Sequence, residues 1–325
     1  MLSPDAYLSA HEEGIHVIDT GFHRPRFDAA YLVVERGRAA FIDTGTNHSV
    51  PRLLGALSAL GLGVDAVDYV IATHVHLDHA GGVGLLMQSL PNARLVVHPR
   101  GARHLIDPAA LMAGALAVYG QEELDRSYGQ VVGVDESRVI STHDGFALDF
   151  AGRALLFIDT PGHARHHHCI WDARSRGFFT GDTFGLSYRE FDTDAGAFII
   201  PTTTPVQFEP DPLKASVERM LSFDPAWMYL THYGPVDGVP ALGRQFLSTL
   251  DAMVALGHAA AGQADRDASL RHGLSTLYLD RVRAHGVTLP DAQVQELLAL
   301  DVELNAQGMA IWLDRLARDA VKEAS

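Results

Sequence analysis

The stretch from residue 73 to residue 82 reads Thr73-His74-Val75-His76-Leu77-Asp78-His79-Ala80-Gly81-Gly82. It follows the apolar residues 69–72, whose composition is typical of a buried strand. A tight turn at the end of this strand can direct alternate side chains at one point. The stretch holds three imidazoles and one carboxylate close together: His74, His76, Asp78 and His79. Nitrogen donors with a hard oxygen donor suit a divalent first-row metal, with zinc as the default and iron or manganese as alternatives.

Three later motifs also stand at the ends of predicted strands. Thr160-Pro161-Gly162-His163-Ala164 follows one strand, Thr180-Gly181-Asp182-Thr183 ends the next but one, and Thr231-His232-Tyr233-Gly234 follows a third. Each motif adds one histidine or aspartate to the candidate metal ligands. The four motifs together make a chance cluster of solvated histidines a poor explanation.

These motifs, in this order, resemble the signature of the metallo-β-lactamase superfamily over roughly residues 15–235. The resemblance implies an α/β fold, a four-layer αββα sandwich of two mixed β-sheets. It also implies two metal sites that share a bridging Asp182. In this assignment, one metal is held by His74, His76 and His163, and the other by Asp78, His79 and His232.

The chemistry expected of such a centre is hydrolysis. Each metal has three or four protein ligands and keeps a position for solvent, as catalytic sites do. A hydroxide between two metals is a nucleophile near neutral pH. Asp78 and Asp182 are therefore expected to be catalytic as well as metal-binding. Tyr188 and Arg189 lie shortly after Asp182 and are candidates to polarise a substrate oxygen, although both are equally consistent with ordinary loop residues.

Residues beside the ligands are expected to support them. The resemblance favours Asp43, at the end of an early strand, as a carboxylate that orients a ligand histidine, whereas the alternative is a capped turn. Strand alternation predicts that His167 faces away from its neighbours His166 and His168. Cys169 is expected to be buried and unreactive.

The pattern along the chain predicts the architecture independently of the motifs. Strands and helices alternate in each half, which favours two mixed sheets with helices outside. Residues 183–209 form a long irregular stretch, followed by a helix at about 211–222. Three helical stretches follow from residue 240, and the last two lie near 268–284 and 291–319. We therefore expect a catalytic domain over residues 1–239 and a helical C-terminal extension over residues 240–325.

Charge and hydrophobicity indicate which kinds of binding partner to expect. The formal net charge of −15 opposes nucleic-acid binding. No apolar run approaches the ~20 residues that span a bilayer, and the N-terminus lacks a signal peptide, so a cytoplasmic protein without membrane contact is expected. The helices after residue 240 carry apolar residues that would be exposed unless they are covered: Leu297, Leu298, Trp312, Leu313 and Leu316. We expect these helices to line the substrate pocket and to form a homodimer. The alternative is that they pack on the back of the catalytic domain.

The substrate class follows from what the sequence lacks. Secreted β-lactamases commonly place cysteine where Asp182 stands, and thioesterases of the glyoxalase II type differ at the motif beginning at Thr231. The expected function is therefore a dinuclear metal-dependent hydrolase of a small-molecule ester, lactone or phosphoester. The alternative is an iron-dependent oxygen or redox enzyme, or a ligand-responsive regulatory protein, although flavodiiron relatives place a glutamate where His76 stands.

Overall fold

The computed structural model of the chain describes residues 3–323, and these form two compact units. Unit 1 comprises the described residues up to Asp159 together with His166–Gly181 and Pro225–Val236. Unit 2 comprises Thr160–Arg165, Asp182–Asp224 and the described residues from Asp237 onward. The units interleave along the sequence. The domain boundary predicted at residue 240 stays a prediction.

Unit 1 contains two mixed β-sheets. In the first, β1 to β4 are antiparallel neighbours, whereas β4 to β7 run parallel. Its strands, in spatial order, are β1 (Leu8–Ala10), β2 (Ile15–Asp19), β3 (Ala29–Glu35), β4 (Arg38–Ile42), β5 (Val67–Ala72), β6 (Arg94–Val97) and β7 (Val139–Ser141).

The second sheet has six strands, and only β11 and β12 pair in parallel. Its spatial order is β13 (Gly234–Val236), β12 (Trp227–Leu230), β11 (Gly177–Gly181), β10 (His168–Asp172), β9 (Arg153–Asp159) and β8 (Phe146–Phe150). Two mixed sheets with flanking helices confirm the predicted fold class. The three-residue strands β1 and β13 were not predicted, because Leu8-Ser9-Ala10 and Gly234-Pro235-Val236 are short and form no continuous apolar run.

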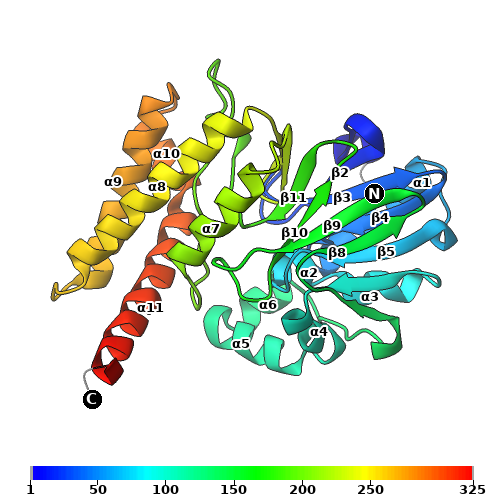
Figure 1. Cartoon of the computed structure of the whole chain (residues 1–325), viewed down its shortest axis with the longest axis horizontal. Coiled ribbons are helices and arrows are strands. Elements are labelled where there is room, and N and C mark those ends of the chain that lie inside the picture. The colour runs from blue at the N-terminus through cyan, green and yellow to red at the C-terminus, as the bar shows by residue number, and fades with distance from the viewer. Residues whose placement is uncertain (1–2, 324–325) are drawn as a thin grey trace. The chain divides into compact units, whose positions relative to one another are not determined.

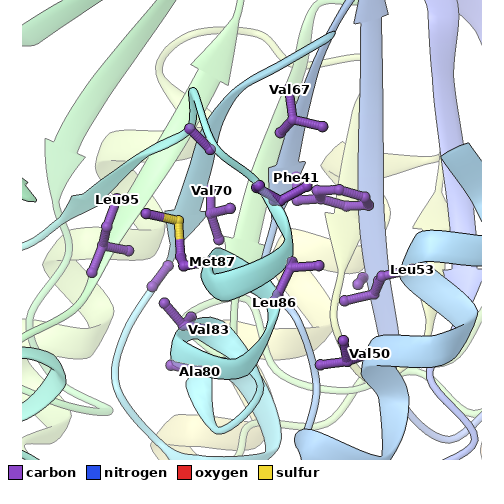
Figure 2. Packing of buried hydrophobic residues seen from close by; sticks show 14 of the residues in the cluster. Phe41, Val50, Leu53, Val67, Val70, Ala80, Val83, Leu86, Met87 and Leu95 are labelled. Carbon is purple, nitrogen blue, oxygen red and sulfur yellow. The ribbon is translucent and has the colours of Figure 1, made fainter. Parts of the chain in front are cut away.

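Alternation along the strands of the first sheet builds two apolar layers. In β4, Ala40 and Ile42 join the core between the sheets, whereas Phe41 belongs to the layer beneath the helices. Figure 2 shows this outer layer, in which Phe41 and Val70 meet side chains from α1 (Val50–Ala59) and α3 (Val83–Ser89). Strands buried on both faces read as continuous apolar runs, which is why the sequence predicted them clearly. The remaining helices of unit 1 are α2 (Leu77–Ala80), α4 (Pro99–Ile106), α5 (Ala109–Tyr119) and α6 (Gln121–Ser127).

Unit 2 is mainly helical and includes the predicted C-terminal helical extension. Its helices are α7 (Pro210–Leu221), α8 (Val239–Ala260), α9 (Arg266–Ala284), α10 (Asp291–Leu297) and α11 (Ala299–Glu323). Helices α8, α9 and α11 lie side by side, in yellow, orange and red in Figure 1. The stretch predicted as one helix over 291–319 is two helices, α10 and α11.

The apolar side chains of α11 divide between the interior of unit 2 and the surface. Trp312 lies against Phe208 and His258, with ring centroids 5.9 and 5.1 Å apart. Leu313 and Leu298, which follows α10, are also buried, and Leu297 is half-buried. Leu316 is exposed, as are Leu300, Ile311 and Val321. Three of the five residues of the expected apolar patch, Leu298, Trp312 and Leu313, are therefore internal, and the homodimer stays a prediction. No helix among residues 3–323 has the length and apolar composition needed to cross a membrane.

Candidate metal centre

Asp43 organises the loop that follows β5. Because β4 and β5 are parallel, their carboxyl ends meet at one edge, and Asp43 directly follows β4. One oxygen of its carboxylate accepts the amide of Thr73 at 2.8 Å, and the other accepts from His79 Nδ1 at 3.0 Å. Thr231, which follows β12 in the other sheet, also donates its hydroxyl to Asp43, at 3.1 Å. Asp43 thus orients a ligand-type histidine and joins the ends of three strands.

A group of three ligand-type side chains lies within unit 1: Asp78, His79 and His232. One potential ligand atom from each of the three lies within 4.8 Å of the others. His232 Nδ1 donates to the carbonyl oxygen of Phe27 at 3.1 Å, as His79 Nδ1 donates to Asp43. Because a carbonyl or a carboxylate can only accept, both Nδ1 atoms carry the hydrogen and both Nε2 atoms are the remaining ligand positions.

His74 and His76 converge beside this group. His74 is buried, and its Nδ1 lies 3.1 Å from the hydroxyl of Thr73. Its Nε2 lies 2.7 Å from His76 Nδ1. The chain reverses between β5 and α2, so the two side chains, two residues apart, point at the same place.

Unit 2 holds the other two predicted ligands as a pair. His163 Nε2 lies 3.3 Å from Asp182 Oδ2. His163 Nδ1 donates to the carbonyl oxygen of Thr202 at 3.2 Å, so Nε2 is again the available nitrogen. Gly162 permits this turn, because a Cβ on it would lie 2.3 Å from Leu213 Cα and its φ is +134°.

The donor set fits metal ions. The Nε2 atoms of His79 and His232 lie 3.8 and 3.5 Å from Asp78 Oδ2, and His163 Nε2 lies 3.3 Å from Asp182 Oδ2. In neutral imidazoles whose Nδ1 carries the hydrogen, these pairs set a nitrogen lone pair against a carboxylate oxygen. Such an arrangement is favourable only when a proton or a metal cation lies close to both atoms, and a metal cation is the partner that this donor set suits. The chain therefore carries His/Asp clusters able to bind metal ions.

The predicted substrate donors lie in unit 2, in the segment after Asp182. Tyr188 is buried, and its hydroxyl donates to the carboxylate of Asp301 at 3.1–3.2 Å. Arg189 donates to the carbonyl oxygen of Ser187 at 2.8 Å and lies 3.5 Å from Asp192. Both roles stay predictions.

The three consecutive histidines differ from the predicted alternation. His166 and His167 both stack against His74, with ring centroids 6.2 and 4.7 Å away. They precede β10, so extended alternation does not govern them. His168, the first residue of β10, instead donates Nε2–H to the carbonyl oxygen of Ala72 at 2.9 Å. Cys169 is buried, as predicted.

His168 predicts a pH-dependent stability. Burial, with a smaller contribution from His98, lowers the pKa of His168 to about 3. The unfolded chain therefore binds a proton between pH 6.5 and pH 3 that the folded chain excludes, and stability falls as the pH falls through this window. Between pH 7 and pH 5, the protonation of this one histidine in the unfolded chain should lower the free energy of unfolding by about 2 kcal/mol. Urea unfolding of the metal-free protein should show this decrease in the free energy of unfolding. In a His168→Gln variant, the decrease between pH 7 and pH 5 should be smaller by the contribution of His168. Equal pH dependence in both proteins would contradict the assignment.

The sequence analysis did not identify Asp28 as a residue near the site. Asp28 directly precedes β3 and follows Phe27, whose carbonyl oxygen accepts from His232. Asp28 is fully buried and accepts the Thr20 hydroxyl at 2.7 Å. Burial raises the pKa of Asp28 to about 7, while His232 and His79 lower it. A buried acid in an otherwise apolar run, Phe27-Asp28-Ala29-Ala30, was the available signal.

Comparisons with known proteins give a family match and similar structures. The family model described as Metallo-beta-lactamase superfamily matches residues 23–232. The metallo-beta-lactamase fold-containing protein ST1585 of Sulfurisphaera tokodaii is 28% identical over 233 residues, which cover 69% of this chain and 79% of that protein. The solved structure of ST1585 has a TM-score of 0.65 at 24% identity and covers 92% of this chain and 98% of its own.

Two further structures are similar. A metallo-beta-lactamase family protein from Thermus thermophilus, TTHA1429, has a TM-score of 0.61 at 21% identity, covering 88% of this chain and 93% of its own. The chemotaxis sensor ODP, solved as a peroxy diiron species, has a TM-score of 0.52 at 19% identity, covering 74% of this chain and 93% of its own. At these identities, the likeness concerns the fold alone.

Proposed function

Because the chain belongs to the metallo-beta-lactamase superfamily, we propose that it is a dinuclear metal-dependent hydrolase of a small-molecule ester, lactone or phosphoester. The observation that carries the proposal is the opposition of histidine Nε2 atoms and carboxylate oxygens at Asp78 and Asp182. These are nitrogen and oxygen donors of the kind that bind divalent first-row metals.

The proposed ligand assignment follows the order of the family's motifs along the chain. His74, His76 and His163 would hold one ion, Asp78, His79 and His232 would hold the other, and Asp182 would be shared. Asp182 directly follows β11, and His163 lies in the short connection between β9 and β10. Two divalent ions would supply Lewis acidity and lower the pKa of water, so that a nucleophile is available near neutral pH.

The protein's own residues would orient and hold the ligands. Asp43, the Phe27 carbonyl and the Thr202 carbonyl each accept an Nδ1–H, so three histidines keep the tautomer that presents Nε2. The buried setting excludes water from these bonds and strengthens them. Tyr188 and Arg189 are retained in the proposal as donors to a substrate oxygen, and Tyr188 would have to release its hydrogen bond to Asp301 to act as one.

Metal content and hydrolysis test the proposal together. After mild loading with Zn²⁺, elemental analysis should give close to two ions per chain, because seven ligands divide into two sites. The loaded protein should hydrolyse at least one compound in a panel of esters, lactones and phosphoesters. A ratio held at one under excess metal would exclude the dinuclear centre.

The redox alternative has one observation in its favour. A structurally similar protein is a chemotaxis sensor solved as a peroxy diiron species, although that likeness concerns the fold alone. Protein purified without added metal should therefore be analysed first. Predominant iron with oxygen uptake, and no hydrolysis across the panel, would favour an iron-dependent oxygen or redox protein.

A further inference from the structure

Asn305, in α11, is a fully buried polar side chain whose hydrogen bonds are all defined. Its Oδ1 accepts the amide hydrogen of Thr203 at 2.7 Å. Its Nδ2 donates to the carbonyl oxygen of Pro201 at 3.2 Å and to the hydroxyl of Tyr278 at 2.7 Å. Because an amide N–H can only donate and a carbonyl can only accept, the orientation of the Asn305 side chain follows from its partners.

The peptide that Asn305 binds also contacts His163. The amide hydrogen of Thr203 and the carbonyl oxygen of Thr202 belong to one planar peptide group and point in opposite directions. The carbonyl end accepts from His163 Nδ1 at 3.2 Å. A single planar peptide group therefore links the side chain of Asn305, at its N–H end, to the imidazole of His163, at its carbonyl end.

We infer that Asn305 is a positioning residue for His163, acting through the peptide between Thr202 and Thr203. The inference rests on the proposed function in taking His163 as a metal ligand. Donation to Asn305 polarises the peptide and makes the Thr202 carbonyl a stronger acceptor for Nδ1–H. That bond holds His163 in the tautomer that presents Nε2 to a metal and raises the basicity of that nitrogen.

The surrounding contacts fix Asn305 and the peptide together. Gly308, about one turn after Asn305, lies so near residue 204 that a Cβ on it would be 2.4 Å from the carbonyl oxygen of Thr204. The Thr203 hydroxyl donates to the carbonyl oxygen of Leu304 at 3.3 Å. The segment 201–204 is therefore held along one face of α11, and Asn305 cannot move independently of it.

The same helix reaches the segment that follows Asp182. Asp301, one turn before Asn305, accepts from the Tyr188 hydroxyl. The two segments are also paired with each other, because Leu186 and Ile200 exchange backbone hydrogen bonds at 3.0 and 3.1 Å. In unit 2, α11 thus supports the segments that contact His163 and follow Asp182, and Asn305 binds the peptide whose carbonyl oxygen accepts from His163.

The test compares Asn305→Ala with Tyr278→Phe in the full chain. Tyr278→Phe removes a hydroxyl that binds the same asparagine but leaves the bond to Thr203, so it controls for loss of stability. Nitrogen-15 NMR of metal-free protein should show His163 as the Nδ1–H tautomer in the wild type and in Tyr278→Phe, and as a mixture in Asn305→Ala. Chelator competition should show Zn²⁺ affinity about 10-fold weaker at one site in Asn305→Ala and within about 2-fold of wild type in Tyr278→Phe.

Asn305→Asp keeps an oxygen facing Thr203 and, with its buried carboxyl protonated, a donor facing the carbonyl oxygen of Pro201, so it serves also if Asn305→Ala does not fold. It should retain the wild-type tautomer, and its Zn²⁺ affinity should stay within about 3-fold of the wild type. An unchanged His163 tautomer in Asn305→Ala, equal loss of affinity in Tyr278→Phe, or a changed tautomer in Asn305→Asp would each overturn the inference. If the wild type binds no Zn²⁺, the proposed function fails, and the tautomer comparison still decides the role of Asn305.

Discussion

Replacing Asp182 with alanine is expected to lower kcat/KM by about 10³-fold or more, equivalent to at least ~4 kcal/mol of transition-state stabilisation. The proposed centre shares this carboxylate between two ions, and its Oδ2 lies 3.3 Å from His163 Nε2. Its removal should therefore lower the number of bound Zn²⁺ ions as well as turnover. The variant should remain folded, because a carboxylate contributes no apolar packing to either sheet.

A matched control is Asp194→Ala, which removes an exposed carboxylate from the same segment of unit 2. Its metal content and turnover should match those of the wild type. Circular dichroism and the urea midpoint should be compared for both variants. Hydrolysis by Asp182→Ala within a few-fold of the wild type, at unchanged metal content, would remove Asp182 from the centre.

A chain that ends at Pro240 is expected not to give a soluble folded protein. The segment 183–209 is packed on the deleted helices: Phe184 stacks on Phe246 with centroids 5.7 Å apart, and Phe208 packs on Trp312. Removing the partner of a buried aromatic costs ~3–5 kcal/mol, and several such losses exceed a typical total stability of ~5–15 kcal/mol. Soluble yield and circular dichroism would measure the effect.

The control for this truncation is a chain that ends at Ala317. It removes exposed residues of α11 but keeps Arg315, which donates to the carbonyl oxygen of Phe208 at 2.8 Å. This shorter deletion should leave solubility, metal content and turnover unchanged. A soluble, monomeric 1–240 fragment with the catalytic efficiency of the full chain would show that the helical extension serves neither the pocket nor the fold.

The predicted elements of unit 1 agree with the structure because their signals are local. Residues 39–42, 69–72 and 95–97 are apolar on both faces, and they form the buried strands β4, β5 and β6. Elements without such a signal were missed or merged. Strand β1 is only three residues long, and α10 and α11 share one continuous helical pattern although the structure separates them.

In the candidate site too, the residues with a local sequence signal were predicted more directly than those without one. The loop beginning at Thr73 indicated its chemistry through residue types and spacing, and His74 and His76 do converge in the structure. The partners of the ligands carried weaker signals. Asp43 was expected only through the family resemblance, and the hydroxyl of Thr231 reaches it across 188 residues.

By itself, the sequence determined the fold class, the motifs at the strand ends and the chemical type of the candidate ligands. These follow from alternation and from donor chemistry, which depend on neighbouring residues. Only the tertiary structure decided which acceptor each histidine Nδ1 meets and what holds that acceptor. Asn305 lies 102 residues from Thr203, and an asparagine on an amphipathic helix has no local feature that distinguishes a buried bond from solvent exposure. Its role depends on the packing of α11 against residues 201–204, which no local pattern encodes.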